Sequence, residues 1–512
     1  MGKGQRVRAA RAAEKEAMKA EQIKKAKKTK LTRIVSLIVA AVLLVTLFGG
    51  VLYHTIYSSA YNKGTIQRDT VVLKSDNYTV DAAMMSYFFY TQYNNFVSTY
   101  SSYISSLGLD TSKSLKRQTS AFDKDSTWYD YFCDQAGSQV KELIYLAEKA
   151  IEKGMKLDDE DKASVKSTID TYYETAEENK IDKSKFLGLA FGTGVNESDV
   201  TKCLELSVMA DKYHQAYMDE LKYTDAEIEK FYTDNIDDYR YVDYYSYSVV
   251  TEDPEDEAKV ADAKKKATEL SGIKNVDAFK AWVDKTYRAE NPVTDENTKE
   301  KQDEGAKKVV DALLSEQVTY TKDDKASEWL FKTGKKGETY LHDEGEGVYT
   351  VYLLAATPYR DETATRTIRD IVLTTENYKK EELKTQAERI MKEMKAAGLT
   401  EETFKKFAAE YSENTASSAN GGLCENYKKS SFEGNIGDWT YNSARKAGDF
   451  EAFEIDGGYA ICYYVGEGIP AWKMDCTSAK KNADYEAAYE KWEKEITLTE
   501  NEKGYNKIPD NV

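Results

Sequence analysis

The sequence is poor in proline and histidine, and these shortages exclude whole classes of protein. Five prolines among 512 residues permit long uninterrupted helices and strands. Three histidines (His54, His214 and His342) are too few for a histidine-based metal site or a Ser/His/Asp triad. The sequence also lacks HExxH, GxSxG and a phosphate-cradling glycine loop. We therefore expect neither a metal nor a cofactor.

Cysteine is scarce as well. The five residues, Cys133, Cys203, Cys424, Cys462 and Cys476, are scattered without a CxxC pair. An odd number of widely separated cysteines is not the pattern of a fold that disulfides hold together. Cys424 and Cys462 fall within one predicted domain, and whether they pair stays open.

Charge is distributed unevenly along the chain. Residues 1–33 contain twelve Lys/Arg and three Asp/Glu, which gives this segment a charge of +9. The net charge of the whole chain is −17, so the remaining residues carry −26. A domain this acidic repels nucleic acid and anionic lipid and favours solubility. We expect no nucleic-acid partner.

An uncharged segment, residues 34–62, follows the basic tail, and its first twenty residues are nearly all apolar. At about 1.5 Å per residue a helix of this length crosses a hydrocarbon core of roughly 30 Å. The basic flank places the N-terminus in the cytoplasm. We predict a basic cytoplasmic tail at 1–33 and a transmembrane signal anchor at 34–56, with the bulk of the chain extracytoplasmic at the cell membrane. The alternative is a signal peptide cleaved after Ala60.

Residues 77–239 show helical periodicity. Apolar residues recur at helical spacing in 140–150, and Gly154 follows as a stop. Thr224-Asp225-Ala226-Glu227 has the pattern of a capping box. Because no proline or glycine cluster separates these segments, they are predicted to form one helical body.

Two rounds of strand, helix, helix and strand follow. The first runs from strand 241–250 through helices 257–270 and 277–287 to strand 347–354. The second runs from strand 366–373 through helices 380–397 and 402–411 to strand 458–465. Trp329 precedes Gly347 by the same eighteen residues that separate Trp439 from Gly457. This correspondence indicates an internal repeat.

Several segments also carry a resemblance to a known family. They are residues 147–160, 186–200 and 223–232 in the helical part, and 407–412, 421–423 and 458–459 in the second round. In this order they resemble the PrsA/SurA-type extracytoplasmic foldases, in which a helical chaperone body precedes parvulin-type peptidyl-prolyl isomerase domains. We predict an α+β protein with a single N-terminal transmembrane helix, a helical SurA/PrsA-like body at 70–238, parvulin-like domains at 239–360 (degenerate) and 361–468, and a C-terminal helical tail at 469–512.

The resemblance assigns site residues and reveals departures. A parvulin's first strand usually reads Arg-His-Ile and its last Gly-Tyr-His-Ile, with Cys or Asp seven residues before a double glycine. Here Asp370, Ala460 and Asn414 occupy those three positions. In the first repeat Thr350 takes the place of the last-strand histidine. The resemblance makes Asp370 and Asn414 the candidate catalytic residues, and Ile436, Trp439 and Tyr459 the candidate substrate-binding residues.

These departures weaken the expected chemistry. Rotation about a peptide bond has a barrier of roughly 18–20 kcal/mol, and a parvulin-like site lowers it by binding the twisted amide rather than by a covalent step. Asp370 can accept a hydrogen bond, whereas the side chain of Ala460 cannot. Isomerase activity is therefore expected to be weak or lost.

The predicted function is a membrane-anchored, extracytoplasmic folding factor that binds unfolded or nascent secreted polypeptides. Two alternatives stay open: an active peptidyl-prolyl isomerase, and a non-enzymatic envelope scaffold that docks one defined partner. Tyr87, Phe88, Phe89 and Tyr90 have two interpretations, as exposed contacts for clients or as helix core.

Overall fold

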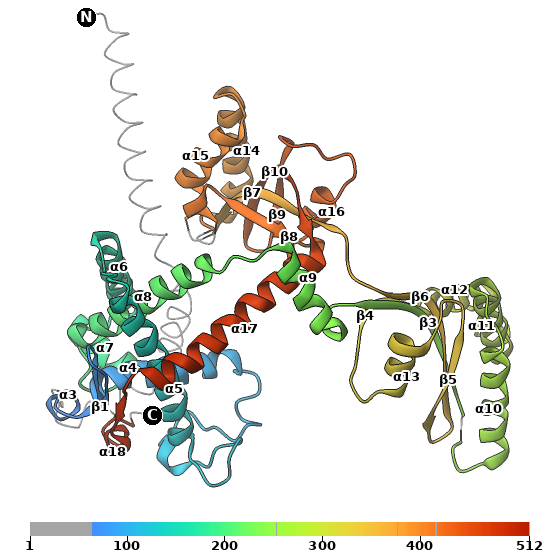
Figure 1. Cartoon of the computed structure of the whole chain (residues 1–512), viewed down its shortest axis with the longest axis horizontal. Coiled ribbons are helices and arrows are strands. Elements are labelled where there is room, and N and C mark those ends of the chain that lie inside the picture. Colours follow the sequence, from blue (N-terminus) through green and yellow to red (C-terminus); the bar gives the residue numbers. More distant parts are fainter. Residues whose placement is uncertain (1–63, 252, 376, 415–416, 511–512) are drawn as a thin grey trace, which may run out of the picture. The chain divides into compact units, whose positions relative to one another are not determined.

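The computed structural model describes residues 64–510 except 252, 376, 415 and 416 (Figure 1). The chain divides into two compact units. Within the described residues, unit 1 takes in 64–222, 366–467 and 481–510, and unit 2 takes in 223–365 and 468–480. The predicted tail at 1–33 and anchor at 34–56 lie outside the described residues. None of the helices in the described part is long and apolar enough to cross a membrane.

Residues 64–222 of unit 1 form a helical body. Its elements are α3 (Thr65–Arg68), α4 (Ala82–Thr99), the 3-10 helix η1 (Leu115–Arg117), α5 (Trp128–Glu152), α6 (Asp159–Glu178), α7 (Lys183–Phe191) and α8 (Glu197–Glu220). Capping boxes begin α5, α6 and α8, so the first backbone amides of these helices have side-chain partners. Gly154 follows α5 at a φ of 74°, the left-handed conformation of a helix stop, as its position predicted.

The C-terminal residues complete this body. The later part of α17 (Ala471–Glu495) packs its Trp492 against Tyr213 of α8, with ring centroids 5.5 Å apart. It is followed by β11 (Thr499–Glu500) and α18 (Glu502–Tyr505). Strand β11 joins β1 (Val71–Lys74) and β2 (Thr79–Asp81) in a three-stranded sheet of order β11-β1-β2.

The helical prediction is wrong at residues 79–81, which form β2. Thr79 and Val80 are β-branched and favour an extended backbone. Asp81 then acts as the N-cap of α4, because its carboxylate accepts from the backbone amides of Ala83 and Met84 at 2.9 and 3.0 Å. The helix therefore begins at Ala82 rather than at Asn77.

The aromatic run at the start of α4 lies in the core. Tyr87, Phe88, Phe89 and Tyr90 are all buried, so the core interpretation is confirmed and exposed client contact at these four positions is excluded. The exposed aromatic side chains of the helical body lie instead between or beside α4 and α5: Tyr100, Tyr103 and Phe122 are 43%, 66% and 58% exposed.

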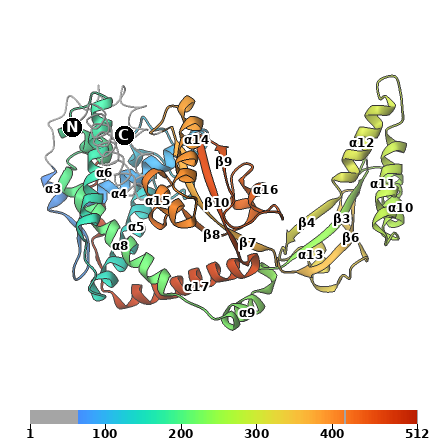
Figure 2. The same ribbon diagram turned by 90° about the horizontal axis from the view of Figure 1, so that it is seen from above.

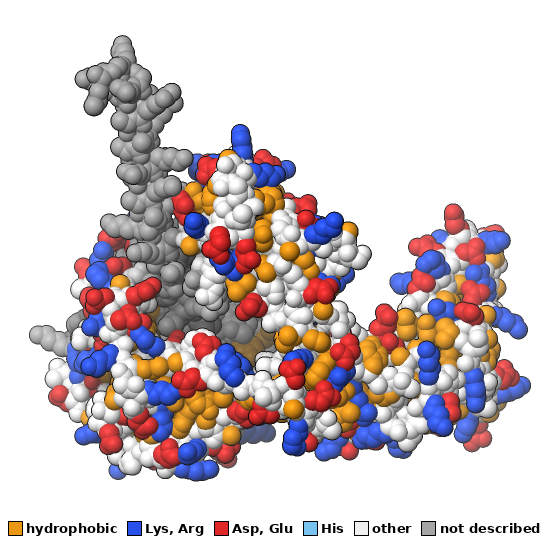
Figure 3. Space-filling view, turned by 45° about the horizontal axis from the view of Figure 1, so that its top comes forward, with side chains coloured by type: hydrophobic (Ala, Val, Ile, Leu, Met, Phe, Trp, Pro, Cys, Tyr) orange, Lys and Arg blue, Asp and Glu red, His pale blue; other side chains and the backbone are white. Residues whose placement is uncertain are grey.

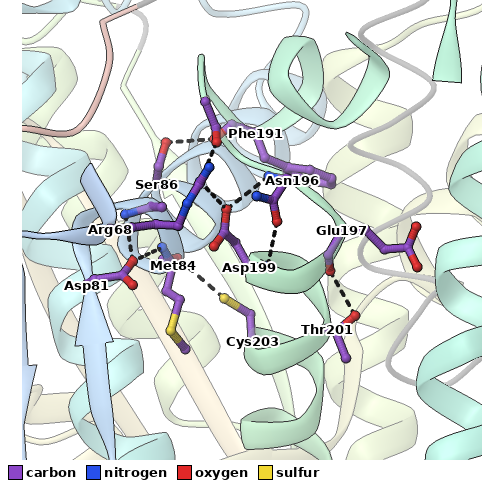
Figure 4. A network of polar contacts seen from close by, with 12 residues as sticks. Arg68, Asp81, Met84, Ser86, Phe191, Asn196, Glu197, Asp199, Thr201 and Cys203 are labelled. Carbon is purple, nitrogen blue, oxygen red and sulfur yellow. Dashed lines mark hydrogen bonds and ion pairs between the residues drawn. The ribbon is translucent and has the colours of Figure 1, made fainter. Parts of the chain in front are cut away.

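An ion pair links α3 to α8 inside the helical body (Figure 4). The Nη1 of Arg68 donates to Asp199 Oδ2 at 2.9 Å and to the carbonyl of Gly194 at 2.7 Å. The same Oδ2 accepts from the backbone amide of Asn196 at 3.0 Å, so Asp199 both caps its helix and holds the arginine. Asp199 is fully buried, whereas the Arg68 side chain is 29% exposed.

Replacing Asp199 with Ala is expected to destabilise the protein by about 3 kcal/mol, because it removes a buried carboxylate partner of the Arg68 guanidinium and a helix cap. Chemical denaturation would measure this loss. The exposed neighbour Ser198 is the matched control, and Ser198→Ala should stay within about 0.5 kcal/mol of wild type. Equal stability of the two variants would contradict a structural role for the ion pair.

Unit 2 contains a four-stranded antiparallel sheet of order β4-β3-β6-β5. Its strands are β3 (Tyr241–Val250), β4 (Leu314–Thr319), β5 (Thr339–Gly345) and β6 (Val348–Tyr359). Its helices are α9 (Asp225–Asp234), η2 (Ile236–Asp238), α10 (Glu257–Ser271), α11 (Val276–Glu290), α12 (Lys299–Asp311), α13 (Lys325–Glu328) and the π-helical turn η3 (Trp329–Thr333). The capping box predicted at Thr224 and Glu227 begins α9, and the predicted strand 241–250 pairs with the strand that follows Gly347.

The second sheet, within residues 364–470, has the order β8-β7-β10-β9. Its strands are β7 (Ala364–Thr374), β8 (Leu423–Tyr427), β9 (Phe450–Ile455) and β10 (Gly458–Pro470). The helices are α14 (Lys380–Ala396), α15 (Glu401–Tyr411), η4 (Ser418–Asn420), η5 (Lys429–Ser431) and α16 (Ile436–Thr440). Figure 2 shows α14 and α15 on one side of this sheet and α16 on the other.

The two sheets share one connectivity. In each sheet the first and the last strand of the repeat lie side by side in the centre. These strands are β3 and β6 in the first repeat, and β7 and β10 in the second. Thr251 and Thr375 make the same backbone contact, each donating its amide to the carbonyl of Gly347 or Gly457 at 3.0 and 3.3 Å. The repeated α+β arrangement predicted from the sequence is therefore present in the fold.

Candidate functional site

Alternation along β7 divides its side chains between the two faces of the sheet. Ile371 and Leu373 pack with Leu383 and Phe404 in the core under α14 and α15. Ile368 and Val372 belong to a second apolar cluster on the opposite face, with Ala460 of β10. Asp370 alternates with Ile371 and therefore lies on the same face as Ala460 and α16.

Asp370 is 8% exposed and lies at the centre of a small polar cluster. Its Oδ2 accepts from Asn414 Nδ2 at 2.6 Å, and its Oδ1 accepts from Ser417 Oγ at 2.5 Å. The structure thus brings together Asp370 and Asn414, the two candidate catalytic residues. Ser417 was missed by the sequence analysis, although it lies only three residues beyond Asn414.

The double glycine allows this cluster to form. Gly422 has a φ of 76°, and a Cβ on it would lie 2.2 Å from the carbonyl oxygen of Asp370. The amide of Asp370 donates to the carbonyl of Gly422 at 2.7 Å. Only glycine permits both the left-handed backbone and this close approach, so the Gly421-Gly422 pair holds the loop that carries Ser417 against β7.

Burial controls the protonation of the site. It raises the pKa of Asp370 above the usual carboxyl range, and the hydrogen bonds from Ser417 and Asn414 act in the opposite direction. Burial also raises the pKa of the nearby Cys424 thiol to about 12, with the Asp370 charge adding to the effect. Cys424 and Cys462 are both free and buried, so the pairing left open by the sequence does not occur. These neutral thiols are poor nucleophiles.

Two of the candidate substrate-binding residues, Ile436 and Trp439 of α16, lie on this face. Both are buried in the cluster with Ala460. The guanidinium carbon of Arg445 lies 4.1 Å from the Trp439 ring centroid, and the ring of Phe453 lies 5.5 Å away in an edge contact. The buried Nε1 of Trp439 has no hydrogen-bond partner among the described residues.

Tyr459 does not join them. It packs against the opposite core, under α14 and α15, and its hydroxyl lies 3.5 Å from Glu454 Oε2. Because adjacent residues of a strand face opposite sides, Tyr459 and Ala460 cannot serve one site. Its assignment as a substrate-binding residue, carried over from the resemblance, is therefore not supported by its placement.

The arrangement can position a polar group but offers little for proton transfer. Each carboxylate oxygen of Asp370 already accepts a hydrogen bond, and Ala460 supplies no polar side-chain atom. The neighbouring indole of Trp439 and the side chain of Ile436 are buried and pack with Ala460.

Comparison with known families agrees with this geometry. Residues 352–462 match the family model of the PPIC-type PPIase domain. The chain contains a parvulin-type domain. The match begins within β6, ends within β10 and covers 111 of the 512 residues, including Asp370, Asn414, Ile436 and Trp439. No curated protein matches the chain.

Proposed function

We propose that the chain is a membrane-anchored, extracytoplasmic folding factor of the PrsA/SurA type that binds unfolded secreted polypeptides and has little or no isomerase activity. The observation that carries this proposal is the cluster of Asp370, Asn414 and Ser417 beside Ala460, where a parvulin usually has two histidines. In place of the two histidines the chain has a carboxylate that already accepts two hydrogen bonds and a methyl group that can form none.

The parvulin-type domain then serves as a binding module. Beside the polar cluster lies an apolar one, in which Ile436 and Trp439 are buried and Phe453 is partly exposed, and a prolyl peptide would bind at its exposed edge. A surface that binds the planar and the twisted amide equally well gives affinity without rate acceleration. Trp439→Ala is accordingly a substitution that acts on peptide binding rather than on turnover.

The helical body supplies a second surface for clients. Tyr100, Tyr103 and Phe122 are exposed, and Phe122 packs against Tyr131 with ring centroids 5.1 Å apart. Large aromatic side chains held in place at a surface offer contact area without further ordering, which suits partners of varied sequence.

The chain is expected to delay the aggregation of several unrelated unfolded proteins, as followed by light scattering. Tyr103→Ser with Phe122→Ser should shorten that delay at least about twofold, because each exposed ring contributes apolar contact area. Ile66→Ser, which removes another exposed apolar side chain from α3, is the control and should leave the delay unchanged. Binding to one partner with no effect on the others would instead support the scaffold alternative.

An active isomerase is the second candidate, and it too has a specific observation in its favour. Asp370 is a buried carboxylate with a raised pKa in the parvulin-type domain, and such groups are common in catalytic sites. In that case Asp370 would have taken over the role of the missing histidine.

A further inference from the structure

The first repeat, in unit 2, carries a pocket on the sheet face equivalent to that of the parvulin-type site, beside Trp329. The shared contacts of Thr251 and Thr375 align Ser246 with Asp370, and Thr350 with Ala460. Thr350 shares a hydrogen bond of 2.8 Å with Ser248, which corresponds to Val372 rather than to a catalytic position. The equivalent of Trp439 is Trp329, eighteen residues before Gly347. This face of the first repeat has no counterpart of the Asp370 cluster, but it has an indole, that of Trp329.

The indole is placed differently in the two repeats. Trp439 is buried, whereas Trp329 is partly exposed and stacks on Tyr340 with ring centroids 5.4 Å apart and planes 17° from parallel. Tyr340 stacks in turn on His342, and its ring centroid lies 6.5 Å from that of Tyr352 on β6. The sheet face opposite α10 and α11 therefore carries a strip of aromatic rings.

A pocket of about 450 Å³ opens at the end of this strip. The rings of Trp329 and Tyr340 form its apolar part, and its charged lining consists of Asp323, Asp324, Glu328 and Lys325. Gly334 permits the arrangement, because a Cβ there would lie 3.0 to 3.1 Å from the Trp329 indole.

The pocket has an excess of negative charge. Glu328 holds Lys332 at 3.0 Å, and Asp324 caps α13 through the amide of Ser327 at 2.6 Å. Asp323 forms no ion pair with any side chain in the described part of the chain. Burial raises the pKa of Tyr352 to about 12, and the carboxylates of Glu344 and Asp324 contribute in the same direction. Over the surface drawn in Figure 3 the two signs are interspersed. At the pocket Glu328 is paired with Lys332, which leaves Asp323 and Asp324 with Lys325 and a net charge of −1.

We propose that this pocket binds the lysine or arginine side chain of an extended polypeptide, with the aromatic rings contacting its cation and the carboxylates neutralising it. Rings of Trp and Tyr attract a cation over their faces, and adjacent carboxylates add a charge-assisted hydrogen bond. The partner's nature, an unfolded client, rests on the proposed function. The charge preference rests only on the pocket.

The test is fluorescence anisotropy of labelled decapeptides with the full chain in detergent micelles. One peptide alternates Lys with Phe, and its matched partner alternates Glu with Phe. The Lys peptide is expected to bind at least about tenfold more tightly, and its affinity should fall as salt rises. Trp329→Ala should weaken it about tenfold and Trp329→Phe about threefold or less, since phenylalanine keeps a ring for the cation.

Matched variants separate the pocket from general acidity. Asp323→Asn should weaken the Lys peptide, whereas Asp295→Asn, which removes the same charge from an exposed position of unit 2, should not. Equal affinity for both peptides, or loss of the preference in Asp295→Asn as much as in Asp323→Asn, would overturn the proposal. Failure to delay aggregation, with the charge preference intact, would overturn the proposed function alone.

Discussion

Restoring both histidines, Asp370→His with Ala460→His, is expected to raise the rate of prolyl isomerisation at least about tenfold over wild type. The wild-type domain should turn over near the uncatalysed rate, with relaxation in tens to hundreds of seconds at room temperature. In wild type Asp370 is an acceptor whose two oxygens are engaged by Asn414 and Ser417, and Ala460 provides no polar atom. Histidine at both positions supplies donors as well as acceptors to the twisted amide. A protease-coupled prolyl-peptide assay measures the rate.

Single substitutions provide the controls. Either histidine alone should give less than the pair, because the two side chains act on one amide. Position 460 is buried in a packed cluster, so a larger side chain there costs about 1–3 kcal/mol, and thermal unfolding must show that the variant stays folded. Trp439→Ala in the double variant should abolish the gain by removing the binding surface. Rapid wild-type turnover that collapses in Asp370→Ala would instead show that the carboxylate is catalytic.

Local signals in the sequence were sufficient for much of the fold. Capping residues predicted where α9 begins, and Gly154 predicted where α5 stops, because these signals act within a few residues. The alternating strands around Tyr247 and Ile371 likewise predicted two sheets. The three-stranded sheet could not be predicted, since β1 pairs with β11 more than 400 residues away and the strands are only two to four residues long.

The candidate site was also predicted only in part, because some of its residues are marked by a local sequence pattern and others are brought in by the path of the chain. Asp370 and Asn414 occupy positions that the family pattern marks, and the structure joins them. Ser417 has no such mark, because its contact depends on the path of the loop before Gly422. The misplacement of Tyr459 was avoidable: it precedes Ala460 in a strand, and the alternation of side chains already put the two on opposite faces.

Deleting residues 497–512 is expected to lower the unfolding temperature of the helical body by about 10 °C or more. These residues cap one helix of the body and fill part of its core. The Asp510 carboxylate accepts from Ser114 Oγ at 2.5 Å and from the amide of Leu115 at 3.1 Å, which caps η1. Ile508 is fully buried in the main core of the body.

Buried tyrosines also depend on this segment. The single proton of the Tyr129 hydroxyl is shared between the carbonyls of Tyr505 and Ile508, at 2.6 and 2.9 Å, and the Tyr90 hydroxyl donates to the carbonyl of Pro509 at 2.9 Å. Loss of a buried isoleucine costs about 2–3 kcal/mol, and each lost hydrogen bond about 1 kcal/mol. The deletion should therefore cost at least about 4 kcal/mol, where about 2.5 °C per kcal/mol is typical of a body this size.

Point substitutions divide this effect. Asp510→Ala removes only the cap and should cost about 1 kcal/mol. Glu502→Ala, at an exposed position of α18, should stay within about 0.5 kcal/mol of wild type. Circular dichroism gives the melting curves, and hydrogen exchange of α4 and α5 localises the change, since both helices lose partners in the deletion. Unaltered exchange in these helices, with a melting temperature within about 2 °C of wild type, would show that the helical body folds without its C-terminal residues.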